Sequence, residues 1–239
     1  MSSNNPPNAV PDPAKYDAWF DSPLGAACLA SEIHLLGDAA GGIAGKTVIE
    51  IGCGTGRVLL GLAGAADIVV GIDRDRGMLE IARQKETLYE MEPCFWVEAD
   101  ASSIPFADNS IDLVFENTLL CSCYDPVPII LEMVRVCKPG GMVLLGELNP
   151  LAPWQLWRRL KARLGLGSFL RATWHSPSHL QFLLAETRCS TRFVGRAIFF
   201  PPFNVRNVLG WRMLAEFVGR RVWPWAGAYY ILAGVKGNP

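Results

Sequence analysis

The stretch that decides the fold is "KTVIEIGCGTGRVLLGLAG", from Lys46 to Gly64. An apolar run that contains one acid, Glu50, is followed by three alternating glycines, at 52, 54 and 56, and then by a helical pattern. Because glycine has no Cβ atom, the backbone of such a loop can turn sharply and lie directly against a ligand. The helix that follows offers free N–H groups to an anionic ligand. The stretch therefore predicts a strand, a ligand-binding turn and a helix.

The alternation of strand and helix patterns continues beyond this stretch. Apolar runs predict strands at 47–52, 67–73, 94–100, 111–120 and 142–148, and helical spacing predicts helices at 57–66, 77–90 and 127–138. The strand runs are nearly continuous in Val, Ile and Leu, which indicates burial on both faces of a sheet. Strands that alternate with helices form a parallel doubly wound sheet. We therefore predict an α/β fold with a ligand site at the carboxyl ends of its strands.

The regular alternation ends after Leu148. The later patterns predict helices at 154–165, 176–187 and 205–222, and strands at 189–200 and 227–236. Ser176 is the expected N-cap of the second of these helices, with Pro177 at its first position. Two late strands beside five parallel ones predict a doubly wound, mostly parallel, seven-stranded sheet that carries a small helical cap insert.

The composition fits one large globular domain. The chain has 239 residues, of which 50% are hydrophobic and 19% charged, enough apolar material for a sizeable core. The seven cysteines are odd in number and form no CxxC pair, so we expect free thiols in a reducing cytoplasm and no metal site. The sequence shows neither a signal-peptide pattern nor a membrane-spanning apolar run, and we expect residues 1–12 to be disordered.

The charge is distributed unevenly along the chain. From Ser2 to Pro150 the sequence has 9 Lys/Arg and 21 Asp/Glu, a net charge of −12. From Leu151 to Pro239 it has 13 Lys/Arg but only Glu186 and Glu216, a net charge of +11. This asymmetry predicts an anionic partner for the second part of the chain.

Two classes of cofactor bind at a glycine turn of this kind. A dinucleotide site has the spacing GxGxxG, but Arg57 stands where its third glycine would be and the spacing is GxGxG. Glu50 precedes the turn, and a carboxylate there favours a positively charged ligand over a pyrophosphate. S-adenosylmethionine (SAM) combines a cationic amine, a carboxylate and a nucleoside, so it suits both the acid and the glycine turn.

Further acids follow the next two expected strands. Asp73 ends the second strand, where a carboxylate can accept hydrogen bonds from both ribose hydroxyls. Asp100 ends the third strand beside Ala101, where it can accept from the adenine amino group, and Met78 is expected to pack on the adenine ring. A strand-end aspartate is often only a helix cap, but three acids at three successive strand ends around one glycine turn indicate a SAM site.

Together the motifs resemble those of the class I SAM-dependent methyltransferases. "VIEIGCGTG" is similar to their first motif, "VVGIDRDRGML" to the second, "VEADASSIPFADNSIDLVFENTLL" to the third and fourth, and "EMVRVCKPGGMVLLGELN" to the fifth. "IPFADNSIDLV" and "RVCKPGG" resemble the ubiquinone/menaquinone-biosynthesis type, methyltransferase type 11. The resemblance covers residues 46–149 and is thin beyond Pro150.

The resemblance implies a fold and a set of cofactor contacts. It implies the strand order 3-2-1-4-5-7-6 with the last strand antiparallel, and an N-terminal segment, "YDAWFDSPLG", that closes over the cofactor. We divide the chain into lid helices at 13–45, a SAM-binding core at 46–150, and a cap with the last two strands at 151–239. The cofactor-binding residues that we expect are Tyr16, Trp19, Glu50, Gly52, Cys53, Gly54, Gly56, Asp73, Arg74, Met78, Asp100, Ala101, Glu116 and Asn117.

These observations predict a cytoplasmic methyltransferase that acts on a small, apolar or aromatic acceptor. The sulfonium of SAM activates the methyl group, so the protein must place the acceptor atom in line and exclude water. A hydroxyl acceptor would benefit from a base, and His175 is the candidate because we expect the cap to overhang the site. Cys121 and Cys123, just past the fourth strand, suit either a soft metalloid or ordinary buried positions in a loop.

Two other functions share some of these features. A SAM-binding protein without transfer activity, serving as a sensor or an assembly partner, would have the same glycine turn and acids. A dehydrogenase would bind a dinucleotide, which Arg57 argues against.

The cap combines tryptophan with basic residues. Six of the eight tryptophans follow Pro150, and arginines and one lysine are interleaved with them: Trp154, Trp157, Trp174, Trp211, Trp223 and Trp225, with Arg158, Arg159, Lys161, Arg163, Arg212, Arg220 and Arg221. This pattern suits the surface of an anionic membrane, and it equally suits an acidic, apolar substrate. Otherwise the tryptophans are core residues and the arginines cover the acidic half. Nucleic acid is disfavoured because the sequence contains no recognised binding module.

Overall fold

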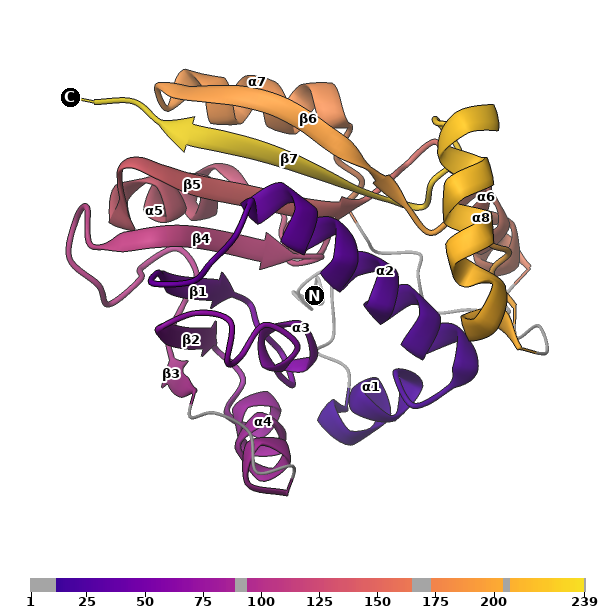
Figure 1. Cartoon of the computed structure of the whole chain (residues 1–239), viewed down its shortest axis with the longest axis horizontal. Coiled ribbons are helices and arrows are strands. Elements are labelled where there is room, and N and C mark those ends of the chain that lie inside the picture. The colour runs from indigo at the N-terminus through magenta and orange to yellow at the C-terminus, as the bar shows by residue number, and fades with distance from the viewer. Residues whose placement is uncertain (1–11, 89–93, 165–172, 204–206, 239) are drawn as a thin grey trace, which may run out of the picture.

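A computed structural model describes residues 12–88, 94–164, 173–203 and 207–238. Its centre is a seven-stranded sheet in the order β3-β2-β1-β4-β5-β7-β6, which confirms the predicted order (Figure 1). The first five strands run parallel, and β7 is antiparallel to both β5 and β6. The strands are β1 Thr47–Ile51, β2 Ile68–Asp73, β3 Phe95–Glu98, β4 Ile111–Asn117, β5 Cys137–Leu148, β6 Cys189–Ala197 and β7 Tyr229–Lys236.

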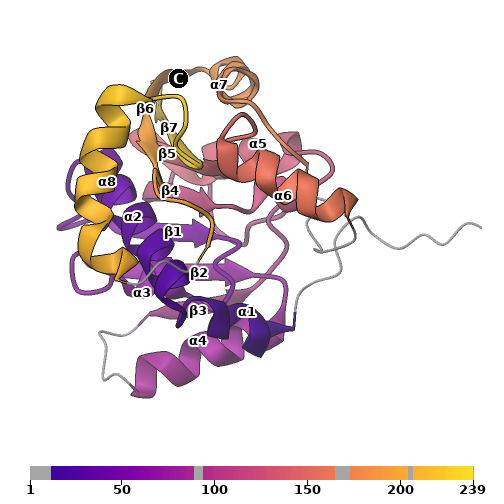
Figure 2. The same cartoon turned by 90° about the vertical axis from the view of Figure 1, so that its right-hand side faces the viewer.

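Helices cover both faces of this sheet. The helices are α1 Pro13–Trp19, α2 Pro23–Ala40, α3 Arg57–Leu60, α4 Arg76–Leu88, α5 Val127–Val136, α6 Pro153–Arg163, α7 Pro177–Glu186 and α8 Val208–Val222, with a short 3-10 turn, η1, at Leu120–Ser122. Viewed along the sheet, α2 and α8 lie on one face, and α5 and α7 lie on the other (Figure 2). Among the described residues, no helix is long and apolar enough to cross a bilayer.

The apolar runs of the strands fill two cores, one on each face. Along β4, Leu113 and Phe115 belong to the core under α2, whereas Val114 belongs to the core under α5 and α7. Successive side chains of a strand point to opposite faces, so a continuous apolar run is needed where both faces are covered. The prediction of burial on both faces is confirmed.

One predicted helix is much shorter than expected. The pattern at 57–66 predicted about three turns, but α3 ends at Leu60. A Cβ atom on Gly61 would lie 2.6 Å from the Ile33 side chain of α2, so the close approach of α2 requires glycine there. Gly64 has a φ of +80°, a conformation that ends helical structure.

The predicted N-cap of helix α7 is confirmed. Ser176 is the N-cap of α7, and its side chain accepts a hydrogen bond from the His179 N–H, as expected.

At the N-terminus, Asp12 is ordered and caps α1 by accepting from the Lys15 N–H at 3.1 Å. Residue 12 is therefore ordered, and the prediction of disorder for residues 1–11 lies outside the described part of the chain.

Candidate functional site

The glycine turn follows β1 at the carboxyl edge of the sheet. Gly52, Gly54 and Gly56 have φ angles of +69°, +53° and +73°, which L-residues with side chains rarely adopt. A Cβ atom on Gly56 would lie 2.5 Å from the Trp96 ring, and one on Gly52 would lie 2.7 Å from the Leu119 side chain. Both the backbone conformation and the close packing therefore require glycine at this turn.

Asp73, at the end of β2, holds this turn in place. Its Oδ2 accepts a hydrogen bond from the Gly54 N–H at 2.8 Å, and its Oδ1 accepts from the Asp75 N–H at 2.9 Å. Burial raises the pKa of Asp73, and these two hydrogen bonds oppose the rise. Since each carboxylate oxygen has two lone pairs, Asp73 keeps acceptor capacity for a ligand lying over the turn.

Glu50 is a buried acid with an unsatisfied atom. It is 2% exposed, and its Oε2 has no hydrogen-bond partner among the described residues. Burial, followed by the negative charges of Asp73 and Glu32, raises the pKa of Glu50 well above its usual range. A cationic amine beside Glu50 would supply the missing donor and favour the ionised form, so the chemistry of this acid fits the amino group of SAM.

Helix α1 closes over the same turn. A Cβ atom on Gly54 would lie 3.4 Å from the Tyr16 ring. The enclosed space that remains beside Glu50 is about 20 Å³ and is lined in part by Tyr16, Phe20 and Asn117. A space of this size holds about one water molecule and is far too small for a nucleoside. Entry of a nucleoside here therefore requires α1, which contributes Tyr16 and Phe20 to the lining, to move.

An ion-pair cluster fastens α1 in this closed position. Asp17 of α1 accepts two hydrogen bonds from Arg57, Nε to Oδ1 at 2.8 Å and Nη2 to Oδ2 at 2.6 Å, and one from Lys85 Nζ at 2.6 Å. Burial raises the pKa of Asp17, but the hydrogen bonds from Arg57 and Lys85 outweigh it, and the pKa ends far below its ordinary value. Arg57, which stands where a dinucleotide site has glycine, thus pairs with α1 and holds it against the turn.

The end of β4 is fixed by a polar network from three elements. Tyr229 Oη donates to Asn117 Oδ1 at 2.6 Å, and Asn117 Nδ2 donates to Glu32 Oε2 at 3.1 Å. The next residue, Thr118, has a φ of +57°, which is a strained conformation for a β-branched residue. Strain at the strand end that faces the glycine turn is typical of a functional site. The sequence analysis missed Glu32, whose only signal was an acid between apolar stretches of α2.

Glu116 of β4 and Glu147 of β5 are buried together on the face of the sheet opposite to the Asn117 side chain. Glu116 Oε2 accepts from the Leu119 N–H at 2.9 Å, and Glu147 Oε1 accepts from the Cys121 N–H at 3.0 Å. Burial, and then the charge of Glu147, raise the pKa of Glu116 well above its usual range, and burial raises the pKa of Glu147 to about 7. Two adjacent buried carboxyls do not both ionise readily, so the pair retains a proton up to near neutral pH. The sequence analysis placed Glu116 but missed Glu147.

His175 lies against the same segment. It is buried, and its Nε2 is 3.3 Å from the Leu120 carbonyl oxygen, while its own carbonyl accepts from Tyr230 Oη. A carbonyl oxygen can only accept, so Nε2 carries the proton and Nδ1 is the basic nitrogen. Burial lowers the pKa of His175, which favours the neutral ring, the form that can accept a proton.

The remaining predicted residues lie at varied depths around the turn. Cys53 and Met78 are buried, Ala101 is half-buried, and Arg74 and Asp100 are exposed. Asp100 Oδ1 accepts from the N–H and the hydroxyl of Ser102 at 2.8 and 2.6 Å. Trp19 is 40% exposed and packs edge-on against Phe20. In the described residues, no group of three or more His, Cys, Asp or Glu side chains is arranged to hold a metal ion.

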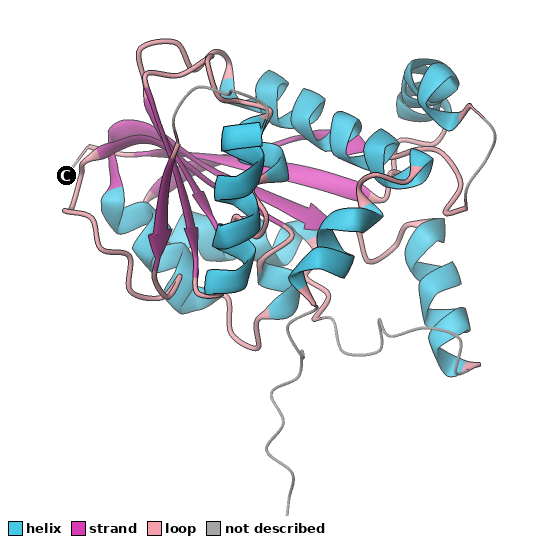
Figure 3. Cartoon of the chain, turned by 90° about the horizontal axis from the view of Figure 1, so that it is seen from below, coloured by secondary structure: helices cyan, strands magenta, loops and turns pink. Residues whose placement is uncertain are grey.

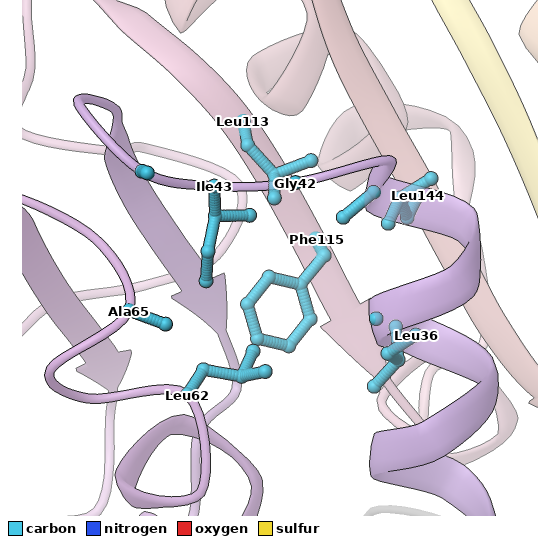
Figure 4. Close-up of a pocket in the computed structure, with 11 residues that line it drawn as sticks. Leu36, Gly42, Ile43, Leu62, Ala65, Leu113, Phe115 and Leu144 are labelled. Carbon is cyan, nitrogen blue, oxygen red and sulfur yellow. The ribbon is translucent and has the colours of Figure 1, made fainter.

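A larger cavity of about 360 Å³ lies elsewhere, between α2, the segment that follows it, and strands β4 and β5. Leu36, Ile43, Leu62, Phe115 and Leu144 are among its lining residues, and the labelled side chains in Figure 4 are all apolar or glycine. The lining carries no group that could bind a charged cofactor or move a proton. The small space at the glycine turn, not this cavity, is the candidate active site.

The strand order, the glycine turn and the acids at the carboxyl edge are those of a class I SAM-dependent methyltransferase. Comparisons with known proteins agree. A family model described as a methyltransferase domain matches residues 49–145. A crystal structure of a SAM-dependent methyltransferase from Thermotoga maritima has a TM-score of 0.70 and 20% identity, covering 93% of this chain and 95% of that one.

Curated relatives also match by sequence. An uncharacterized protein of Mycobacterium tuberculosis is 31% identical over 176 residues, which are 74% of this chain and 58% of that protein. A demethylmenaquinone methyltransferase of Renibacterium salmoninarum is 33% identical over 116 residues, 48% of this chain and 47% of that enzyme. The chain thus spans about half the length of the curated relatives it matches. Residues 49–145 form a class I methyltransferase domain, a class whose methyl donor is SAM.

Proposed function

We propose that this protein transfers a methyl group from SAM to a small, apolar or aromatic acceptor. The observation that carries the proposal is the buried, unsatisfied Glu50 oxygen beside a glycine turn that Asp73 holds from the next strand. A pyrophosphate would place negative charge against this acid, whereas a cationic amine neutralises it. The similarity of residues in the domain to a demethylmenaquinone methyltransferase supports an aromatic, apolar acceptor.

The positions of the residues around the turn support a set of proposed contacts. Glu50 would bind the amine, the turn from Gly52 to Gly56 with Cys53 would bind the carboxylate and sulfonium portion, and Asp73 would bind the ribose. Around the adenine we place Arg74, Met78, Asp100 and Ala101; over the cofactor Tyr16 and Trp19; and beside the methyl group Asn117. The sequence also predicted a cofactor contact for Glu116, but its side chain is buried on the opposite face of β4 and accepts from the Leu119 N–H. SAM supplies a methyl group already activated by its sulfonium.

The protein's own part is positioning, exclusion of water and proton removal. Closure of α1, fastened by Asp17, Arg57 and Lys85, would exclude water from the reacting atoms. The network through Asn117 would hold the acceptor side of the site at a fixed geometry.

His175 is the proposed base for an acceptor hydroxyl, through Nδ1. His175→Gln should lower kcat by about 100-fold or more, the usual contribution of a general base, and should leave SAM binding unchanged. An unchanged kcat with the true acceptor would exclude this role.

For the cap, we propose contact with an anionic partner, either a membrane or an acidic substrate. The excess of basic over acidic residues after Pro150 supports this proposal.

The alternative function is a SAM-binding sensor or assembly protein without transfer activity. The test is turnover of methyl-labelled SAM with a panel of quinol, phenol and fatty-acid acceptors. Transfer of label to any acceptor, abolished by Asp73→Ala, supports the enzyme. Tight SAM binding with no transfer to any acceptor, and no partner-dependent activity, supports the alternative.

A further inference from the structure

Two helices of the cap present apolar side chains to solvent. On α6, Leu156, Trp157 and Leu160 are 58%, 43% and 49% exposed. On α8, Met213 and Phe217 are 55% and 57% exposed. The positions recur every three or four residues, so on each helix they form one stripe. Other exposed apolar residues of the same two helices and their ends are Leu151, Leu164, Leu209, Leu214, Val218, Val222, Trp223 and Trp225. We call the exposed side chains of α6, of α8 and of their ends the docking surface.

The docking surface lies at the carboxyl edge of the sheet, where the glycine turn is. Helix α6 follows the end of β5, and α8 precedes β7, whose antiparallel direction places its beginning at the same edge. Figure 2 looks onto this edge and shows α8 on one side and α6 on the other, with α1 and α2 nearby. In the view from below, both helices stand at the same end of the molecule (Figure 3). The surface therefore flanks the entrance to the candidate active site.

Basic side chains accompany the exposed rings. The Arg221 guanidinium lies 4.4 Å from the centroid of the Phe217 ring, and Lys161 Nζ lies 5.3 Å from that of Trp157. Helix α6 contains no acid, and Glu216, the one acid of α8, is only 5% exposed. The docking surface is thus both apolar and positively charged.

A surface that is both apolar and basic suits an anionic lipid bilayer better than the other candidate partners. Large contiguous apolar patches are rare on monomeric proteins, and they mark interaction sites. A second copy docking by the same face would bring two basic surfaces together, which opposes a self-complementary dimer. Exposed Leu, Met and Val side chains have no use in base stacking, so nucleic acid explains the charge but not the aliphatic stripes. An anionic bilayer accepts apolar side chains at the acyl boundary, tryptophan at the interface and Lys/Arg at its phosphates.

We propose that the docking surface of α6 and α8 binds an anionic lipid bilayer, and that the methyl acceptor is an amphiphile that enters the active site from that bilayer. The second clause rests on the proposed methyltransferase function; the first does not.

The test is flotation of the full-length protein with vesicles, without any acceptor. We expect co-flotation with phosphatidylcholine vesicles that contain phosphatidylglycerol, and little with phosphatidylcholine alone. Phe217→Glu should reduce the partition coefficient at least about tenfold. Phe95→Glu is the matched control, because Phe95 is 59% exposed but lies on β3, at the edge of the sheet far from β7. Equal loss with both variants, or equal flotation with both vesicle types, would overturn the proposal.

Charge is tested separately from apolar contact. Arg221→Gln and Lys161→Gln should each weaken partitioning about fivefold, since a basic residue near an anionic surface contributes about 1 kcal/mol. Self-association without vesicles that Phe217→Glu abolishes would assign the surface to a second copy and overturn the proposal.

A SAM titration of the same samples separates the two proposals. Flotation without SAM binding would contradict the proposed function but leave the bilayer contact standing. SAM binding without flotation would refute the bilayer contact alone.

Discussion

The carboxyl edge of the sheet joins two regions that are built differently. Around the glycine turn, polar groups are buried and held: Asp73 accepts from two backbone N–H groups, and Asn117 bridges Glu32 and Tyr229. On the cap, by contrast, large apolar side chains on and just after α8 are exposed: Phe217, Trp223 and Trp225 are all more than half exposed. The first region is organised by contacts within the chain, and the second presents groups that have few such contacts.

The two regions are expected to differ in how specifically they bind their partners. A site held by buried hydrogen bonds is pre-organised for one ligand, and its residues should be sensitive to conservative substitution. An exposed, apolar and basic surface binds anionic membranes in general rather than one particular molecule. Substitutions there should change where the protein binds and leave its fold and cofactor affinity intact.

Asp73→Ala should have the largest effect on cofactor affinity. SAM affinity should fall by roughly 100-fold or more, because hydrogen bonds to a charged group contribute about 1.5–3 kcal/mol each and the turn also loses its acceptor. Isothermal titration calorimetry with SAM measures this loss. Asp112→Ala is the control, since Asp112 accepts from Thr47 N–H and Lys138 at the opposite end of β4. If both variants lost SAM affinity equally, Asp73 would not be a ligand contact.

Glu147→Gln should change the pH dependence of stability. The pKa of Glu147 is raised by burial to about 7, from 4.5, so the folded state binds the proton more tightly. The stabilising contribution is complete below pH 4.5 and is lost as pH rises through 7. Since glutamine does not ionise, the variant should be more stable than the wild type at pH 8 by on the order of 1–3 kcal/mol, measured by urea unfolding.

Glu132→Gln is a control variant for which the change in stability at pH 8 should have the opposite sign. Hydrogen bonds from Arg135 lower the pKa of Glu132, so its contribution is present above the unfolded pKa and lost as pH falls. Glu132→Gln should therefore lose stability at pH 8. A Glu147→Gln variant less stable than wild type at pH 8 would mean that Glu147 is ionised and satisfied in the folded protein.

Asp17→Asn tests whether the ion-pair cluster holds the lid. Dissociation of SAM, followed by stopped-flow fluorescence, should be roughly tenfold faster, which corresponds to about 1.4 kcal/mol. Asp21→Asn is matched, because Asp21 also pairs with Arg57 but its side chain is 65% exposed against 15% for Asp17. Exposed ion pairs contribute little, so this variant should behave almost like the wild type. Identical rates for all three proteins would show that α1 is not a lid.

The smallest effects are expected on the cap. Phe217→Ala and Trp225→Ala should each change the free energy of unfolding by less than about 0.5 kcal/mol, as expected for exposed positions. Urea unfolding of the full chain measures this change. A loss well above that value for either variant would show that its ring packs within the chain and would remove it from the docking surface.

The sequence allowed good prediction where local backbone chemistry decides the structure. The glycines at 52, 54 and 56 exclude side chains at a turn, and Asp73 ends its strand, so both motifs were identifiable without tertiary information. Glu147 and Glu32 were missed because their burial depends on which strands and helices become neighbours. The length of α3 was overestimated because the close approach of α2 at Gly61 is a packing effect that periodicity does not encode.

The most direct test of the central claim is calorimetric titration of the wild-type protein with S-adenosylhomocysteine and, separately, with NAD. The account predicts saturable heat with the first compound at one site per chain and none with the second. Saturable heat from NAD, with none from S-adenosylhomocysteine or SAM, would contradict the assignment of the turn between Gly52 and Gly56 as a SAM site.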